Sequence, residues 1–193
     1  MLWIHIGMPK TGTTALQAYL HANPTLLADH GIRFMATGRD RGTGQARLIS
    51  HNSLAMDMIR GWANTPATQS QAFRDEYAAH GAGHCLISSE MFFGRDLTPL
   101  RDHVLAGDDT PVRVLVYLRR FDDFIEADYK QRAKNGKSTE GVASFVRGRL
   151  EKIETDPSYM KFTSEFDRIR TALPGADIVP RLYIRDELVG RNV

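Results

Sequence analysis

Short apolar segments alternate with helical segments along nearly the whole of this chain of 193 residues. The stretches between the apolar segments place apolar residues at helical spacing and end at Gly, Asn or Pro. Segments rich in β-forming side chains predict strands at residues 2–6, 32–36, 84–90, 112–120 and 176–184, the first of them buried. This alternation predicts an α/β fold, with three layers (α/β/α) around a central parallel sheet of about five strands.

Size and composition predict one α/β domain that covers residues 1–193. The formal charge of +2 gives no support for a nucleic-acid partner. No apolar run approaches the ~20 residues of a membrane helix, so we expect no membrane span. The only cysteine, Cys85, cannot form an internal disulfide, which suits a reducing compartment and predicts a cytoplasmic protein. The sequence predicts no oligomeric state.

The segment IHIGMPKTGTTALQAYL, residues 4–20, is typical of a strand, a phosphate-binding loop and a helix. Gly7 and Gly12 have the spacing of the pattern G-x-x-x-x-G-K-[ST], which predicts a P-loop type of fold. Where that pattern requires Lys, this chain has Thr13, and Lys10 lies inside the loop instead. A lysine placed there would reach the phosphate nearest the nucleoside, or its bridging oxygen, rather than the far phosphates of a triphosphate.

The fourth predicted strand differs from its counterpart in P-loop kinases. VRVLVYLRR ends in Arg119 and Arg120, where a kinase of this type has an Asp for Mg²⁺. We therefore expect a site that neutralises its anion with side-chain cations and no metal. This pattern favours a ligand other than ATP.

Two of these segments resemble the sulfotransferases that use 3′-phosphoadenosine-5′-phosphosulfate (PAPS). G-x-P-K-T-G-T-T after the first strand is similar to their 5′-phosphosulfate loop, and VYLRRFDDFIEADYKQ is similar to their 3′-phosphate segment. The stretches HNSLA, LISSE and LYIRDELVG also resemble bacterial members. The resemblance implies PAPS as co-substrate, 3′-phosphoadenosine-5′-phosphate (PAP) as product, and transfer of a sulfuryl group to a hydroxyl or amine of a small molecule or glycan.

The resemblance also assigns residues. The 5′-phosphosulfate would be held by Pro9, Lys10, Thr11, Gly12, Thr13 and Thr14. Arg119 would bind the 3′-phosphate, with an ion pair to Asp122 or Asp123 as the alternative role. The family's serine, eight residues after this arginine, falls on Ala127, so Asp128, Lys130 or Arg120 would have to rearrange the site. The family's C-terminal segment, rich in glycine and basic residues, has no counterpart before residue 193, so we expect an incomplete domain.

The acceptor needs a general base. Glu90, at the end of the third strand beside apolar residues 91–93, is the first candidate, and His51 is the second. Arg39, Arg41 and Arg47 lie in a glycine-rich segment, residues 37–47, that we expect to be mobile. Two other functions stay open: a small ATP-dependent P-loop kinase and a non-catalytic nucleotide-binding protein.

Overall fold

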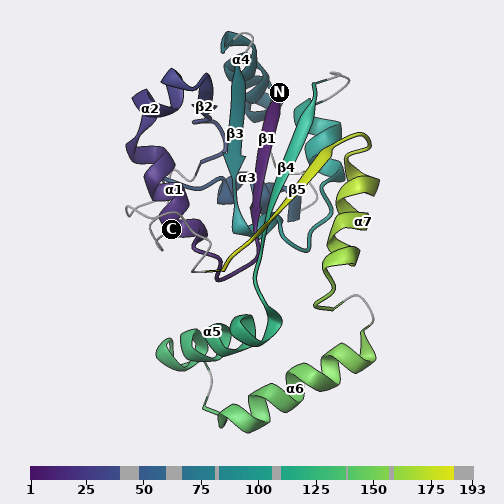
Figure 1. Cartoon of the computed structure of the whole chain (residues 1–193). Coiled ribbons are helices and arrows are strands. Elements are labelled where there is room, and N and C mark those ends of the chain that lie inside the picture. The colour runs from purple at the N-terminus through teal and green to yellow at the C-terminus, as the bar shows by residue number, and fades with distance from the viewer. Residues whose placement is uncertain are drawn as a thin grey trace.

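The chain forms a five-stranded, all-parallel sheet in a computed structural model (Figure 1). The structure describes residues 1–39, 48–59, 67–80, 83–105, 110–137, 139–156 and 159–184. The strands are β1 (Leu2–Gly7), β2 (Ile32–Phe34), β3 (His84–Ser88), β4 (Val112–Leu118) and β5 (Asp177–Leu182). Their order is β2-β3-β1-β4-β5, which confirms the predicted α/β class and the parallel sheet.

Helices fill the connections between the strands, as βαβ units require. The α-helices are α1 (Thr13–Ala22), α2 (Pro24–Asp29), α3 (Asn52–Ile59), α4 (Ala67–Ala79), α5 (Phe121–Lys134), α6 (Val142–Thr155) and α7 (Phe162–Ala172). A 3₁₀ turn, η2 (Glu90–Phe92), follows β3, and a π-helical segment, η3 (Leu100–Leu105), precedes β4.

Side chains of β1 alternate between two cores, which lie on opposite faces of the sheet. Leu2, Ile4 and Ile6 are fully buried in the larger core, together with side chains of α3, α4, η3 and α7. Trp3 packs against the smaller core, which α1 and α2 contribute to. Helices therefore cover both faces, and the molecule has the three layers that the sequence predicts.

The strand order places a topological switch point between β1 and β4, because the chain leaves β1 toward β2 on one side of the sheet and leaves β4 toward β5 on the other. In open parallel sheets, ligands bind at the carboxyl ends of the strands beside such a point. The loop between β1 and α1, residues 8–12, lies there. The fold thus places the expected ligand site at the same loop that the sequence predicts.

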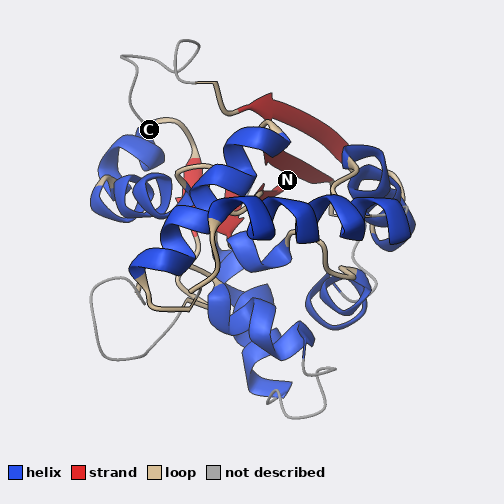
Figure 2. Ribbon diagram, turned by 90° about the horizontal axis from the view of Figure 1, so that it is seen from below, coloured by secondary structure: helices blue, strands red, loops and turns tan. Residues whose placement is uncertain are grey.

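Helices α5 and α6 lie beyond the carboxyl edge of the sheet, below it in Figure 1. Seen from below, helices cross in front of the strands (Figure 2). Helix α5 has no fully buried residue, and Phe145 is the buried residue of α6. The Tyr129 ring of α5 packs 5.4 Å from the Phe145 ring, so the two helices pack mainly on each other.

Parts of the predicted organisation lie outside the described residues. These are residues 40–47 of the glycine-rich segment, with Arg41 and Arg47, and the end of the closing segment from residue 185 onward. Within the described part of the chain, no helix is long and apolar enough to cross a membrane.

Candidate functional site

The loop of residues 8–12 is held in a fixed turn by its own hydrogen bonds. The Thr11 hydroxyl donates to the Met8 carbonyl at 2.6 Å, and the Met8 amide donates to the Tyr117 carbonyl of β4 at 3.0 Å. Gly12 and Lys10 both have left-handed backbones, with φ of 71° and 70°. A lysine in this region is uncommon and costs about 1–3 kcal/mol, so the surrounding contacts must fix it there.

Gly7 is required by the tightness of this turn. A Cβ atom at residue 7 would lie 2.1 Å from the Thr13 hydroxyl oxygen and 3.2 Å from that of Thr11. Both threonines are buried, with their hydroxyl oxygens 3.4 Å apart. Their side chains therefore build the interior of the loop, whereas the next residue, Thr14, is exposed.

The start of α1 leaves backbone N–H groups available to an anion. Its N-cap is Gly12, no side chain caps this end, and its first turn carries no acidic residue. The first intrahelical bond here runs from the Leu16 amide to the Gly12 carbonyl at 3.1 Å, so the amides before Leu16 lack helical partners. These amides and the helix dipole both favour negative charge.

Arg119 ties the end of β4 to this loop. Its Nη1 donates to the Lys10 carbonyl at 2.6 Å, and its guanidinium lies over the Tyr183 ring, 5.5 Å from the centroid. The predicted alternative, an ion pair with Asp122, is formed by the neighbouring Arg120 at 2.5 Å. Arg119 thus stays beside the loop and brings a cation to the carboxyl ends of β1 and β4.

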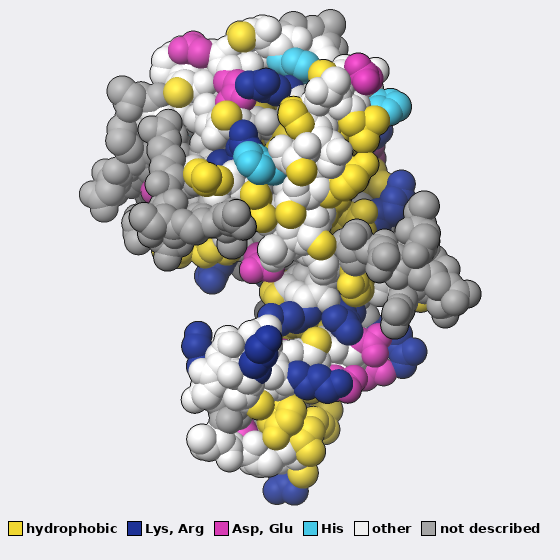
Figure 3. All heavy atoms as spheres, turned by 90° about the vertical axis from the view of Figure 1, so that its left-hand side faces the viewer, with side chains coloured by type: hydrophobic (Ala, Val, Ile, Leu, Met, Phe, Trp, Pro, Cys, Tyr) yellow, Lys and Arg dark blue, Asp and Glu magenta, His cyan; other side chains and the backbone are white. Residues whose placement is uncertain are grey.

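An open hollow of about 370 Å³ lies between the loop and α5. We call it the basic hollow; its lining residues are Lys10, Gly12, Arg119, Ala127, Lys130, Gln131 and Lys134. The α5 residues among them recur at helical spacing and share one face. Figure 3 shows Lys and Arg side chains gathered along the lower part of the molecule, beside a notch below its main body.

Ala127 faces the basic hollow, which therefore lacks the hydroxyl that the resemblance assigns there. Lys130 and Lys134 bring ammonium groups to the same face; Lys130 also pairs with Glu126. Asp128 does not line this hollow. One residue along a helix turns the side chain by about 100°, and its carboxylate is bound by Arg149 at 2.6 Å and by Arg132 at 3.0 Å.

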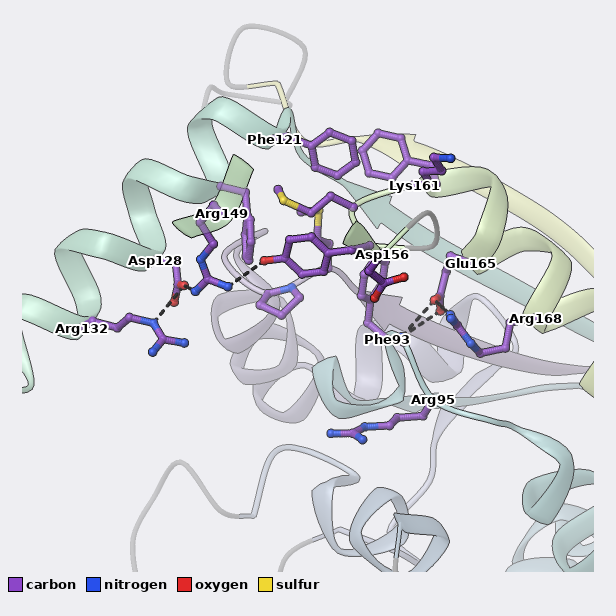
Figure 4. A pocket seen from close by; sticks show the side chains of 17 residues that line it. Phe93, Arg95, Phe121, Asp128, Arg132, Arg149, Asp156, Lys161, Glu165 and Arg168 are labelled. Carbon is purple, nitrogen blue, oxygen red and sulfur yellow. Dashed lines mark hydrogen bonds and ion pairs between the residues drawn. The ribbon is translucent and has the colours of Figure 1, made fainter. Parts of the chain in front are cut away.

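A second cavity, of about 600 Å³, lies on the other side of α5 (Figure 4). We call it the aromatic pocket. Its walls come from the loop, the turn after η2, and helices α5, α6 and α7; the lining residues include Met8, Pro9, Phe93, Arg95, Phe121, Phe124, Asp128, Arg149, Tyr159, Phe162 and Glu165. Because Pro9 lines this pocket and Lys10 lines the basic hollow, the two cavities meet at the loop.

The polar groups of the aromatic pocket are held in place by one another. Arg149 donates to the Tyr159 hydroxyl at 2.7 Å as well as to Asp128. The buried Glu165 carboxylate accepts from the Gly94 amide at 3.0 and 3.1 Å and pairs with Arg168. Burial raises the pKa of the Glu165 carboxyl, although the Gly94 amide and Arg168 act against this shift.

Sequence reasoning missed Glu165 and the pocket around it. One signal was available: Glu165 lies on the apolar stripe of α7, with Phe162, Ile169 and Ala172. An acidic residue on such a stripe must find partners inside the protein.

The end of β3 brings fewer accessible polar side chains to the carboxyl edge of the sheet than the sequence predicts. Ser88 and Ser89 are fully buried, and the Ser89 hydroxyl caps η2 by accepting from the Met91 amide at 3.1 Å. Glu90 is exposed at the start of η2, whereas Phe92, two residues on, is fully buried. Of the three polar residues at this strand end, Glu90 is therefore the one that an acceptor can reach.

His51, the second candidate base, lies in the core. Its amide donates to the Ser88 carbonyl at 2.8 Å, and its Nδ1 accepts from the Ser88 amide at 3.1 Å. Burial, reinforced by the positive charge of Arg39, lowers the pKa of His51 to about 3. The ring is fully buried, so an acceptor cannot reach it.

Ser88 is also the centre of a buried polar cluster beneath the loop. Its hydroxyl lies 2.7 Å from His5 Nδ1 and accepts from Gln17 Nε2 at 3.0 Å. Burial lowers the pKa of His5 to about 4. The cluster joins β1, β3 and α1 just behind residues 8–12, so it fixes the elements that carry the loop.

Comparison of this chain with protein-family models, and with curated proteins, finds no match. Within the described part of the chain, no three His, Cys, Asp or Glu side chains are grouped so that they could hold a metal ion. The site is thus defined by its geometry: an amide-lined turn, Lys10 and Arg119, and a cavity on either side.

Proposed function

We propose that this protein is a PAPS-dependent sulfotransferase that transfers a sulfuryl group to a hydroxyl or amine acceptor. The observation that carries the proposal is the joining of Lys10 and Arg119 by a 2.6 Å hydrogen bond at the uncapped start of α1. A phosphosulfate fits this turn because it carries negative charge close to the nucleoside. The motifs of residues 7–14 and 116–131 support the same assignment.

Each group has a role in this proposal. The amides at the start of α1 bind the 5′-phosphosulfate, and Lys10 stabilises the negative charge that develops on the bridging oxygen. Arg119, with Lys130 and Lys134, binds the 3′-phosphate in the basic hollow. PAPS would supply a sulfuryl group on a phosphate leaving group; as in phosphoryl transfer, positioning and electrostatics would then do most of the work.

Glu90 accepts the proton of the acceptor hydroxyl or amine in the same proposal. We place this activity in the cytoplasm, since the buried, free Cys85 fits a reducing compartment. The acceptor is a small molecule or a glycan. An ATP-dependent kinase would need a carboxylate for Mg²⁺, whereas β4 leads into Arg119 and Arg120.

Ligand-induced thermal stabilisation tests the donor. PAP at about 100 times its dissociation constant should stabilise the protein by about 2.7 kcal/mol, which raises Tm by roughly 5–10 °C. AMP, which lacks the 3′-phosphate, should shift Tm much less at the same concentration. The measurement is a melting curve with PAP, AMP, ATP with Mg²⁺, or buffer alone.

The same panel separates the alternatives. A larger shift with ATP and Mg²⁺ than with PAP would favour a kinase, and no shift with any of the three would contradict nucleotide binding. A PAP shift without transfer to any acceptor would favour a non-catalytic nucleotide-binding protein. Arg119→Gln should reduce the advantage of PAP over AMP, because it removes one of the three cations expected at the 3′-phosphate.

The base is tested by Glu90→Gln, which keeps the shape of the side chain and removes its basicity. Turnover should fall about 10²-fold with the PAP-induced shift unchanged. Glu151→Gln, an exposed change on α6, is the matched control and should leave turnover normal. Turnover within twofold of normal in the Glu90→Gln protein would show that the base is another group.

A further inference from the structure

The aromatic pocket has the size and lining of a small-molecule site. Its volume of about 600 Å³ lies within the 300–1,000 Å³ typical of ligand pockets. Phe121 and Phe162 stack on one wall with ring centroids 4.4 Å apart. Phe93, Phe124 and Tyr159 add further aromatic surface, so the pocket favours a ligand with a flat, ring-based body.

The lining of this pocket carries more positive than negative side chains. Among its described lining residues are five cations and three carboxylates. Asp128 is bound by two of the arginines, and Glu165 is bound by Arg168 and the Gly94 amide. The net charge of the lining is positive, which favours a negatively charged ligand.

Arg95 is the cation best placed to meet such a ligand. Its side chain is exposed and, within the described part of the chain, forms no ion pair or side-chain hydrogen bond. In Figure 4 it runs along the lower side of the pocket with no dashed line to another side chain, whereas Arg149 and Arg168 are both joined to partners. Among the described residues no carboxylate competes for its guanidinium, which can bind an acidic group in the bidentate way typical of arginine.

The backbone that carries Arg95 is held firmly. Gly94 has φ of 72°, and both Glu165 oxygens accept from its amide. The Arg95 amide donates to the Phe92 carbonyl at 3.1 Å, which closes the turn after η2. Glu165 is therefore a positioning residue, because it anchors the turn from which Arg95 extends.

The aromatic pocket borders the loop that is proposed to hold the donor. Glu90, the proposed base, does not line the pocket itself; it begins η2, directly before the turn that carries Arg95. Met8 and Pro9 form part of the pocket wall, and the next residue, Lys10, lines the basic hollow. A donor held across residues 8–12 would thus face this pocket. We propose that the aromatic pocket is the acceptor site, and that it takes a hydroxyl-bearing ring compound whose acidic group is bound by Arg95; this inference rests on the proposed function.

A pair of fluorescent probes tests the inference by binding alone. 6-Hydroxy-2-naphthoate and 2-naphthol share the ring body and the hydroxyl, and differ by one carboxylate. In a fluorescence titration with the unmodified protein and saturating PAP, the carboxylate probe should bind about 10-fold more tightly. Equal affinities, or no binding of either probe, would overturn the proposal.

Variants of Arg95 test whether this side chain causes the preference for the carboxylate probe. Arg95→Gln should remove the 10-fold preference and leave the affinity for 2-naphthol within twofold, and Arg95→Glu should reverse the preference. Arg170→Gln, an exposed change on α7 outside the pocket, is the matched control and should keep the preference. A preference that survives Arg95→Gln would show that the anion is bound elsewhere and would overturn the assignment.

Failure of this inference can be told apart from failure of the proposed function. PAP binding without any preference between the probes would overturn the acceptor class and leave the sulfotransferase proposal standing. Preference for the carboxylate probe, lost in Arg95→Gln, in a protein that PAP does not stabilise would support the anion site in the aromatic pocket and contradict the donor.

Discussion

The Lys10→Ala protein should turn over PAPS about 10²–10³-fold more slowly than the unmodified protein. In the proposed reaction Lys10 is the cation nearest the bridging oxygen, and the loss of one preorganised group of this kind typically costs that factor. The loss should fall on kcat, because the charge that Lys10 stabilises develops in the transition state. The measurement is initial-rate kinetics with an acceptor found by screening, with PAP affinity measured alongside.

The left-handed backbone of Lys10 calls for a second variant. Alanine at φ of 70° adds backbone strain, so a lower rate could reflect a distorted loop. Lys10→Gly relieves that strain and still removes the ammonium group, so it should be as slow as Lys10→Ala. Near-normal turnover in Lys10→Gly would show that the loop conformation matters and the cation does not. The exposed change Lys137→Ala, three residues after the end of α5, should have no effect.

Acidification from pH 7 to pH 5 should reduce the free energy of unfolding by about 4 kcal/mol from two buried histidines. The pKa is about 4 for His5 and about 3 for His51 in the folded protein, against 6.5 when unfolded. The unfolded chain therefore binds more protons below pH 6.5, and stability falls as pH falls. Each histidine contributes about 2 kcal/mol, since one pKa unit corresponds to 1.36 kcal/mol.

Glu165 changes the pH dependence of stability in the opposite direction to the two histidines. Its pKa is raised above 4.5 in the folded protein, so its contribution to stability grows as pH falls through its folded pKa and reduces the net loss. The lowered pKa of Glu76 places its titration below pH 4.5, outside this window.

Variants separate the histidines from these other groups. Urea denaturation at both pH values should show that His51→Gln shrinks the pH-dependent loss by about 2 kcal/mol, because the amide can still accept from Ser88 and does not titrate. The exposed change His30→Gln should leave the loss unchanged. An unchanged pH dependence in His51→Gln would contradict the low pKa of the buried ring.

The order of strands and helices could be predicted because the local pattern agrees with tertiary burial over most of this chain. Each predicted strand lies in the sheet, although the edge strand β5 is largely exposed, and the loop of residues 8–12 lies at the switch point. The segments η2 and η3 carried no periodic signal, because they are too short to show one. Their conformation depends on packing: η3 contacts α4, and η2 contacts β1 and α3.

The site was only partly predictable, because side-chain direction depends on contacts between distant segments. The contact between Lys10 and Arg119 joins residues 109 apart and follows from the pairing of β1 with β4. Asp128 faces away from the basic hollow because Arg149, on the next helix, binds it. No spacing in the sequence marks the burial of His51, which depends on the packing of its segment against the end of β3.

Helix α5 separates the basic hollow from the aromatic pocket. One face, with Ala127 and Lys134, borders the basic hollow, and the other, with Phe124 and Asp128, borders the aromatic pocket. With no fully buried residue of its own, this helix is held mainly by its packing against α6. A ligand in either cavity would contact the same helix, so the two binding events would be coupled through it, and the coupling factor would be the same in both directions.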